Sequence, residues 1–132
     1  ADRPASGAAD SGVATLARWL QEDAQSPVVA YRPAGSDTNV WFDLKVIYQQ
    51  DHAEVDLNSV PPLFMAPVGR FGLTDYDNVF ATLPEDSIFE RRGIHADGAM
   101  VLVRPDQYVA QVLPLSGTTD LGLFLSRFML RP

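Results

Sequence analysis

Six consecutive residues bring together side chains that often bind metal ions. The segment Asp51-His52-Ala53-Glu54-Val55-Asp56 offers one imidazole and three carboxylates. A metal site also needs ligands held in a fixed geometry, and nothing in this segment supplies that geometry. Acidic residues at this density on a loop are typical of a solvated turn, so we assign no metal ligand here.

A second candidate for chemistry is His95, which lies two positions before Asp97. A histidine beside a carboxylate is conceivable as a general base. No nucleophile, oxyanion-stabilising pattern or second titratable partner accompanies it, so we interpret it as an ordinary loop histidine. Arg91-Arg92 is too short a basic run to indicate more than solvated surface.

Two further kinds of chemistry are excluded by what the sequence lacks. The chain has no cysteine, which removes disulfides, thiolate metal sites and dithiol redox chemistry together. No G-x-G-x-x-G pattern follows a strand-like segment, so there is no dinucleotide-binding fingerprint. We therefore assign no catalytic, cofactor-binding or metal-binding residue.

The clearest structural signal is a β-hairpin that begins at Met100. Met100 to Val103 is an uninterrupted apolar run rich in β-branched residues, which predicts a strand inside the sheet and covered on both faces. Arg104 to Gln107 supplies a type I turn, and Tyr108 to Leu113 is the returning strand. Gln107 is expected in the left-handed conformation that favours glycine, at a cost of roughly 1 kcal/mol.

The elements before the hairpin are predicted from capping and periodicity. Ser11 can cap a helix over Gly12 to Asp23, whose apolar residues recur on one face. We expect a short strand at Val28 to Tyr31 and a longer one at Val40 to Gln49. The segment Gly69 to Phe80 reads as a packed irregular loop with a helical turn near residues 75–79.

After the hairpin, a helix with one apolar face is predicted to pack on the sheet. The residues of that face are Leu121, Phe124, Leu125, Phe128 and Met129. Leu123 and Leu130 form a second apolar line that this face cannot bury, which raises the prospect of a contact with another domain or subunit.

Three segments share their order and spacing with a known family. They are Phe42 to Gln49, Gly69 to Phe80, and Asp97 to Leu115 with its Val-Arg-Pro-Asp-Gln-Tyr-Val-Ala core. Together they resemble the C-terminal thioredoxin-like domain of FAD-dependent aromatic hydroxylases, the group of phenol 2-monooxygenase and 3-hydroxybenzoate 4-hydroxylase. The resemblance covers most of residues 41–130, whereas residues 1–39 match only loosely.

The resemblance implies an α/β, thioredoxin-like three-layer domain without a CxxC pair. It also implies that FAD, NAD(P)H and the hydroxylation of a phenolic ring belong to domains outside these residues. Aromatic residues of the 69–80 loop would then lie against those domains, or alternatively would pin the loop to its own core. In such folds a proline before the third core strand is often cis, and Pro61, Pro62, Pro67 and Pro84 are the candidates.

A thioredoxin-like core needs a strand immediately before its first helix, because a right-handed β-α-β crossover starts from one. The polar residues 1–11 do not provide it. We expect the missing strand to lie just upstream of Ala1 and between the strands around Leu44–Tyr48 and Met100–Val103. The chain would then be the C-terminal piece of a longer enzyme with exposed sheet edges. Alone it would be poorly stable, or Val28 to Tyr31 or another subunit's strand would fill the gap.

Composition sets the outer limits. The 132 residues are 46% hydrophobic with a net charge of −7. This length and hydrophobic content predict one domain over 12–132. Residues 1–11 are rich in Ala, Ser, Gly and Asp, which predicts a flexible lead. The acidic balance argues against nucleic acid and anionic membranes as partners. No run is long enough to span a bilayer and no secretory signal is present, so we expect a cytoplasmic protein.

Three classes of function remain to compare. A thioredoxin-like redox enzyme fails because it needs two thiols. A small independent ligand-binding domain or enzyme would need a convergent polar site, which we do not find. The preferred hypothesis is a non-catalytic assembly domain that forms a homodimer and contacts the flavin and substrate domains of its parent chain.

Overall fold

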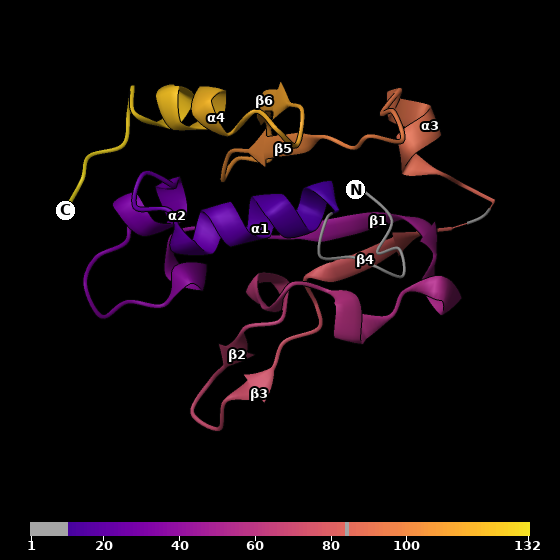
Figure 1. Ribbon diagram of the computed structural model, residues 1–132, viewed down its shortest axis with the longest axis horizontal. Helices are drawn as coiled ribbons and strands as arrows, with labels where there is room; N and C mark the ends of the chain where they lie inside the picture. Colours follow the sequence, from indigo (N-terminus) through magenta and orange to yellow (C-terminus); the bar gives the residue numbers. More distant parts are fainter. Residues whose placement is uncertain (1–10, 84) are drawn as a thin grey trace.

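The structure is a computed structural model that describes residues 11–83 and 85–132 (Figure 1). Its helices are α1 (Gly12–Glu22), α2 (Pro27–Ala30), α3 (Ile88–Arg92) and α4 (Thr118–Leu125). Its strands are β1 (Val46–Asp51), β2 (Pro67–Val68), β3 (Leu73–Thr74), β4 (Val79–Thr82), β5 (Met100–Val103) and β6 (Val109–Leu113). Short 3-10 turns lie at Thr38–Val40, His52–Glu54, Leu57–Ser59 and Pro62–Phe64. Apart from Ser11, the predicted lead lies outside the described residues.

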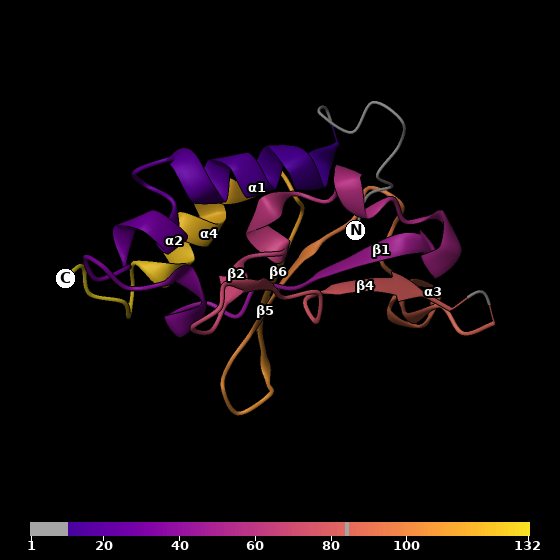
Figure 2. The same ribbon diagram turned by 90° about the horizontal axis from the view of Figure 1, so that it is seen from below.

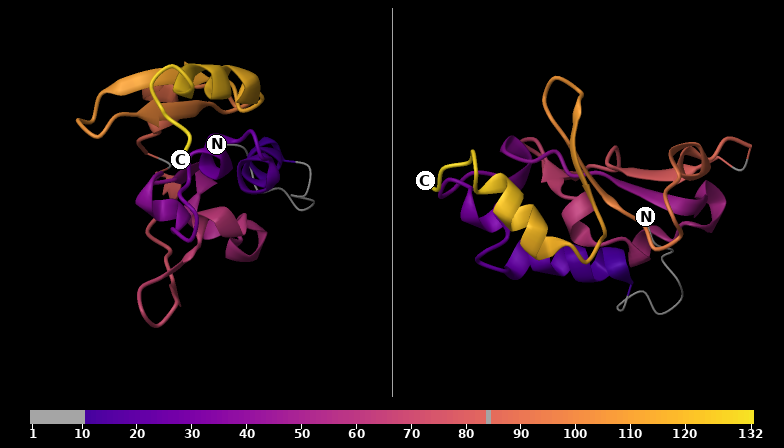
Figure 3. Two further views of the ribbon diagram at one scale, coloured as in Figure 1. Left: turned by 90° about the vertical axis from the view of Figure 1, so that its left-hand side faces the viewer. Right: turned by 90° about the horizontal axis from the view of Figure 1, so that it is seen from above.

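The strands form three separate two-stranded ladders. β1 pairs in parallel with β4, β2 pairs antiparallel with β3, and β5 pairs antiparallel with β6. The β5–β6 hairpin and α4 lie at one end of the molecule and the β2–β3 ladder at the opposite end, with β1, β4 and α1 between them (Figures 1 and 3). The α/β class is confirmed, but in the described residues β1 and β5 do not join into one sheet.

Helix α1 forms as its sequence predicts. The Ser11 side chain accepts a hydrogen bond from the Ala14 backbone N–H at 3.0 Å, and this cap starts the helix. The buried stripe is Val13, Leu16, Ala17 and Leu20. This stripe packs on the main core, which also contains Val46 and Tyr48 of β1. Figure 2 shows α1 along one side of the β1–β4 ladder.

The strand predicted at Val28 to Tyr31 is wrong, because residues 28–30 belong to helix α2 and Tyr31 is its C-cap. Pro27 occupies the first helical position, where its fixed φ suits a helix and no N–H is needed. The Ser26 hydroxyl caps this helix by accepting from the Val29 N–H at 3.3 Å. Two β-branched valines favour a strand locally, but this start signal overrides their propensity. Val28 to Tyr31 therefore cannot fill a sheet edge.

The strand predicted at Val40 to Gln49 is only partly right. Val40 ends a 3-10 turn, residues 41–45 are not in a ladder, and β1 runs from Val46 to Asp51. The alternating burial is nevertheless present, since Phe42 and Leu44 face the core while Asp43 is exposed. The strand starts late because its partner does: the first paired residues are Val46 and Val79.

Two short elements near residues 75–92 also differ from expectation. No helix forms near residues 75–79; a single turn, in which the Val79 N–H donates to the Tyr76 carbonyl at 3.2 Å, leads directly into β4. Helix α3 was not predicted, although Ser87 and Glu90 have the spacing of a capping box and Gly93 ends the helix at φ 62°. Its five residues are too few for a periodic apolar pattern.

The hairpin prediction is confirmed in outline and in its turn. The Gln107 N–H donates to the Arg104 carbonyl at 2.9 Å, and Gln107 adopts φ 71°. The expectation that β5 is covered on both faces is wrong for this chain. Val101 and Val103 are exposed, so no element among the described residues covers that face of β5.

We predict that Gln107→Gly stabilises the protein by up to about 1 kcal/mol, because glycine adopts a positive φ without a Cβ clash. Gln107 is exposed, so the change removes no core contact. Chemical denaturation of both proteins measures the difference. A clear loss of stability would show that the flexibility gained by the unfolded chain outweighs the relief of strain.

Helix α4 joins the hairpin to the rest of the molecule. Leu121 and Leu125 are buried, and Met100, Leu102 and Leu113 of the hairpin pack against them. Phe124 and Phe128 stack edge to face at a centroid distance of 5.4 Å. Phe128 is nevertheless exposed, because it lies beyond the end of the helix at Leu125. Met129, the last member of the predicted face, still packs against the cluster of Leu121 and Leu125. Leu123 and Leu130 are exposed, and their contact with a partner stays a prediction.

Two further observations concern the backbone and membranes. None of the described peptide bonds is cis, which covers Pro61, Pro62 and Pro67, while Pro84 lies outside the described residues. Among the residues that the structure describes, no helix has the length and apolar content needed to cross a bilayer.

Candidate assembly surfaces

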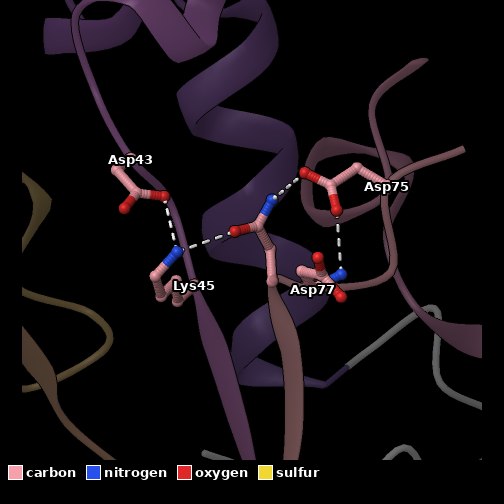
Figure 4. A network of polar contacts seen from close by, with 5 residues as sticks. Asp43, Lys45, Asp75 and Asp77 are labelled. Carbon is pink, nitrogen blue, oxygen red and sulfur yellow. Dashed lines mark hydrogen bonds and ion pairs between the residues drawn. The ribbon is translucent and has the colours of Figure 1, made fainter. Parts of the chain in front are cut away.

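A network of polar side chains fastens the start of β1 to the start of β4 (Figure 4). The Lys45 ammonium donates to Asp43 Oδ1 at 2.8 Å and to Asn78 Oδ1 at 2.9 Å. The Asn78 amide donates to Asp75 Oδ2 at 3.1 Å, and Asp75 Oδ1 accepts from the Asp77 backbone N–H at 2.9 Å. Asn78 is buried. Because these groups satisfy one another at the first rung of the ladder, the network positions strands rather than a reacting group.

The acidic segment that begins at Asp51 caps two turns. Asp51 Oδ1 accepts from the Ala53 N–H at 2.9 Å, and His52 Nδ1 lies 3.1 Å from the same oxygen. Asp56 accepts from the Asn58 N–H at 3.0 Å and from the Ser59 hydroxyl at 3.1 Å. These hydrogen bonds, first that from the Asn58 backbone, hold the pKa of Asp56 below its ordinary value. Within 11–83 and 85–132 no group of three metal-binding side chains converges.

His95 and Asp97 both lie on the exposed loop before β5. The backbone carbonyl of His95 accepts a hydrogen bond from Gln49 Nε2 at 2.8 Å. This bond ties the loop to β1, so its role is to position the hairpin. Nearby, Arg91 forms an ion pair with Asp86 at 2.7 Å.

A groove of about 360 Å³ lies between α1 and residues 58–62, with Arg18, Glu22, Asn58 and Ser59 on its rim. It was not anticipated from the sequence, because its two walls lie far apart along the chain. The groove is open on its outer side, and polar or charged residues alternate in its lining with small apolar residues and two prolines. It is not the largely enclosed apolar chamber that a small-molecule site requires.

The first exposed apolar surface is the outer face of the hairpin, which we call the valine face. Its members are Val101, Val103, Val109 and Val112, with 46%, 48%, 58% and 56% of their surface exposed. Val101 pairs with Val112, and Val103 pairs with Val109. Ala110 has no cross-strand partner, so it is a β-bulge, and this extra residue places Val109 and Val112 on one face although they are three positions apart.

The second exposed apolar surface is the loop that carries β2 and β3, which we call the aromatic arm (residues 66–76). Phe71 at its tip is 85% exposed, and Leu73 and Tyr76 are also exposed. Gly69 and Gly72 take positive φ values of 71° and 60°, which allow the reversal at the tip. The reading in which these aromatic residues pin the loop to its own core is wrong, because the arm projects from the body (Figure 1).

Comparison with known proteins identifies the family of the chain. Residues 2–132 match the family model described as "Phenol hydroxylase, C-terminal dimerisation domain". Over 124 residues the chain is 44% identical to 3-hydroxybenzoate 4-monooxygenase of Comamonas testosteroni. This alignment covers 91% of the chain and 19% of that protein. Over 130 residues it is 24% identical to the FAD-dependent monooxygenase terD of Aspergillus terreus, covering 92% of this chain and 20% of that protein.

The chain thus spans about a fifth of the length of these two relatives. A further relative, the FAD-dependent monooxygenase ankC of Aspergillus thermomutatus, is 34% identical over 68 residues, which are 52% of this chain and 11% of that protein. The family model covers nearly all of the sequence, including the hairpin, the aromatic arm and α4. The chain therefore belongs to the family of phenol hydroxylase C-terminal dimerisation domains.

Proposed function

We propose that these residues form a non-catalytic assembly domain that joins two copies of an FAD-dependent, NAD(P)H-using hydroxylase of phenols or hydroxybenzoates. The observation that carries the proposal is the match of residues 2–132 to a dimerisation family. The names of the relatives, which are FAD-dependent monooxygenases and a hydroxybenzoate monooxygenase, support the activity of the parent protein. The aromatic arm and the exposed line of Leu123 and Leu130 are surfaces for its flavin and substrate domains.

FAD and NAD(P)H belong to other domains in this proposal. The sequence has no glycine-rich dinucleotide fingerprint after a strand, and the groove beside α1 lacks the apolar enclosure that a flavin ring needs. The residues present do not fit either group, so no catalytic step is derived from them. The cytoplasm is the compartment proposed for the enzyme, because a nicotinamide reductant is available there.

The proposed fold is a single thioredoxin-like domain over residues 12–132 behind a lead at 1–11. Each of β1 and β5 is paired along one edge, with β4 and with β6 respectively. A strand supplied from outside these 132 residues would pair with the other edge of each and join the two ladders into one sheet. The shared packing of Met100 against both core clusters supports this arrangement, since it keeps the hairpin close to the β1 side of the core.

Two measurements on the 132-residue chain test the proposed function. Light scattering after size exclusion should give a mass that rises toward twice 14.5 kDa with concentration. The purified protein should show no flavin absorption, even after incubation with added FAD. A chain that stays monomeric at the highest soluble concentration would contradict the dimerisation part, and stoichiometric bound FAD would contradict the non-catalytic part.

A further inference from the structure

We propose that the valine face of the β5–β6 hairpin packs against the same face of a second copy across a two-fold axis. This inference rests on the proposed function as a dimerisation domain and specifies the surface that performs it. A two-fold interface uses one patch on both subunits, so the patch must be compatible with itself. The valine face meets that condition better than any other surface described.

The first argument is the chemistry of the hairpin's two sides. On the inner side Met100, Leu102 and Leu113 pack against the core around α4. An antiparallel hairpin with a solvated outer side would carry polar residues there, in alternation with the apolar inner ones. Instead the outer positions of both strands are valines, brought onto one face by the bulge at Ala110. Both sides of the hairpin are therefore built for burial, and only one is buried.

The second argument is charge. The chain carries a net charge of −7, so two copies repel each other unless they meet at a surface free of acidic excess. Arg104 and Asp106 are the charged residues of segment 100–113, and they neutralise each other in an ion pair of 2.6 Å at the tip. The valine face itself has no charged member. Two such faces can approach without placing like charges opposite one another.

The third argument is rigidity, which separates the valine face from the aromatic arm. The hairpin has four paired positions and is fixed to the core by α4. The arm has two paired positions, Pro67 with Thr74 and Val68 with Leu73, and its exposed residues project away from the core. A preorganised surface loses less conformational freedom on binding. The arm also carries Arg70 and has Asp75 and Asp77 at its base, which suits a polar surface of a different domain.

The exposed apolar area of the valine face sets the expected affinity of the dimer. The four half-exposed valines offer roughly 300 Å² of apolar surface, less than half of the ~800 Å² per partner that a standard interface buries. The isolated chain should therefore dimerise reversibly, with a dissociation constant that lies in the micromolar range rather than far below it. That range makes the effect of small substitutions measurable.

The test compares two double variants with matched geometry. Val101→Thr with Val112→Thr changes a directly paired couple on the valine face, and Val68→Thr with Leu73→Thr changes a directly paired couple on the arm. Threonine is β-branched and has a high strand propensity, so both ladders should persist. Sedimentation equilibrium from about 1 μM to about 1 mM, the range in which weak complexes dissociate, measures the dissociation constant of each. Circular dichroism checks that both remain folded.

The expected result is an increase in the dissociation constant of at least about tenfold for the valine-face variant and of less than about twofold for the arm variant. A dimer that both variants leave unchanged, or that only the arm variant weakens, would overturn this inference and leave the proposed function standing. If the 132-residue chain without substitutions were monomeric, both this inference and the proposed function would be overturned.

A second measurement holds even if the threonine variant fails to fold. Because the chain has no cysteine, Val101→Cys and Leu73→Cys each introduce one position for a nitroxide label. Pulsed electron paramagnetic resonance on the dimer measures the distance between the labels on the two copies. This distance should be short for labels at position 101 and much longer for labels at position 73. The reverse order would overturn the proposed interface.

Discussion

Replacing Leu125 by alanine should lower the free energy of unfolding by about 2–5 kcal/mol, the range found when a buried leucine is truncated. Leu125 is 3% exposed and lies in the core cluster where α2, α4 and the hairpin meet. Its removal would leave a cavity among side chains from three elements, and such a site cannot collapse by moving one of them. Urea denaturation followed by circular dichroism gives the value.

The matched control lies on the same helix. Leu123→Ala removes the same atoms from a residue that is 59% exposed, so its effect on stability should stay within about 0.5 kcal/mol. Equal losses for the two variants would mean that α4 does not present the Leu121–Leu125 side to the core. If Leu123 contacts another domain of the parent protein, its effect will emerge there and not in the isolated chain.

Ser26→Ala should destabilise the protein by about 2–3 kcal/mol, because one hydroxyl performs two tasks in a water-free position. Ser26 is 0% exposed. Its hydroxyl donates to the Leu20 carbonyl at 2.7 Å and accepts from the Val29 N–H at 3.3 Å. Alanine would leave a buried carbonyl at the end of α1 without its donor and would remove the cap of α2. Thermal and chemical unfolding measure the loss.

Ser11→Ala provides the comparison, since Ser11 caps α1 in the same way but is only partly buried. The loss of that cap should cost about 1 kcal/mol. The difference between the two variants isolates the bond from Ser26 to Leu20. If the two losses were the same, that bond would contribute nothing and the junction between α1 and α2 would depend on apolar packing alone.

Features that depend on neighbours in the sequence could be predicted from it. The α1 cap and stripe need only Ser11 and the next turns of the helix. The hairpin turn needs only Arg104 to Gln107, and the left-handed φ of Gln107 follows from the length of that loop. The family could be recognised for the same reason, because the residues that carry the resemblance are contiguous in three segments.

Features that depend on distant partners could not be predicted in this way. Residues 41–45 alternate like a strand, but whether they pair is decided by where β4 begins, more than thirty positions later. The valines at 28 and 29 favour a strand, whereas Ser26 and Pro27 start a helix there. The apolar run in β5 led to the expectation of cover on both faces, but only the side with Met100 and Leu102 packs on the core. A local sequence pattern does not show whether a partner for the second face exists within the same chain.

The pairing of β1 with β4 also has a consequence for the order in which the molecule assembles. The Lys45–Asn78 hydrogen bond at its first rung joins residues 33 positions apart, whereas the Arg104–Gln107 turn closes within four residues. Closing the longer loop costs more chain entropy before any contact compensates for it. We therefore expect the hairpin to form first from local contacts and the parallel ladder to form later. Opening of that ladder without global unfolding would expose the hydrogen-bonding groups of β1 to any incoming strand.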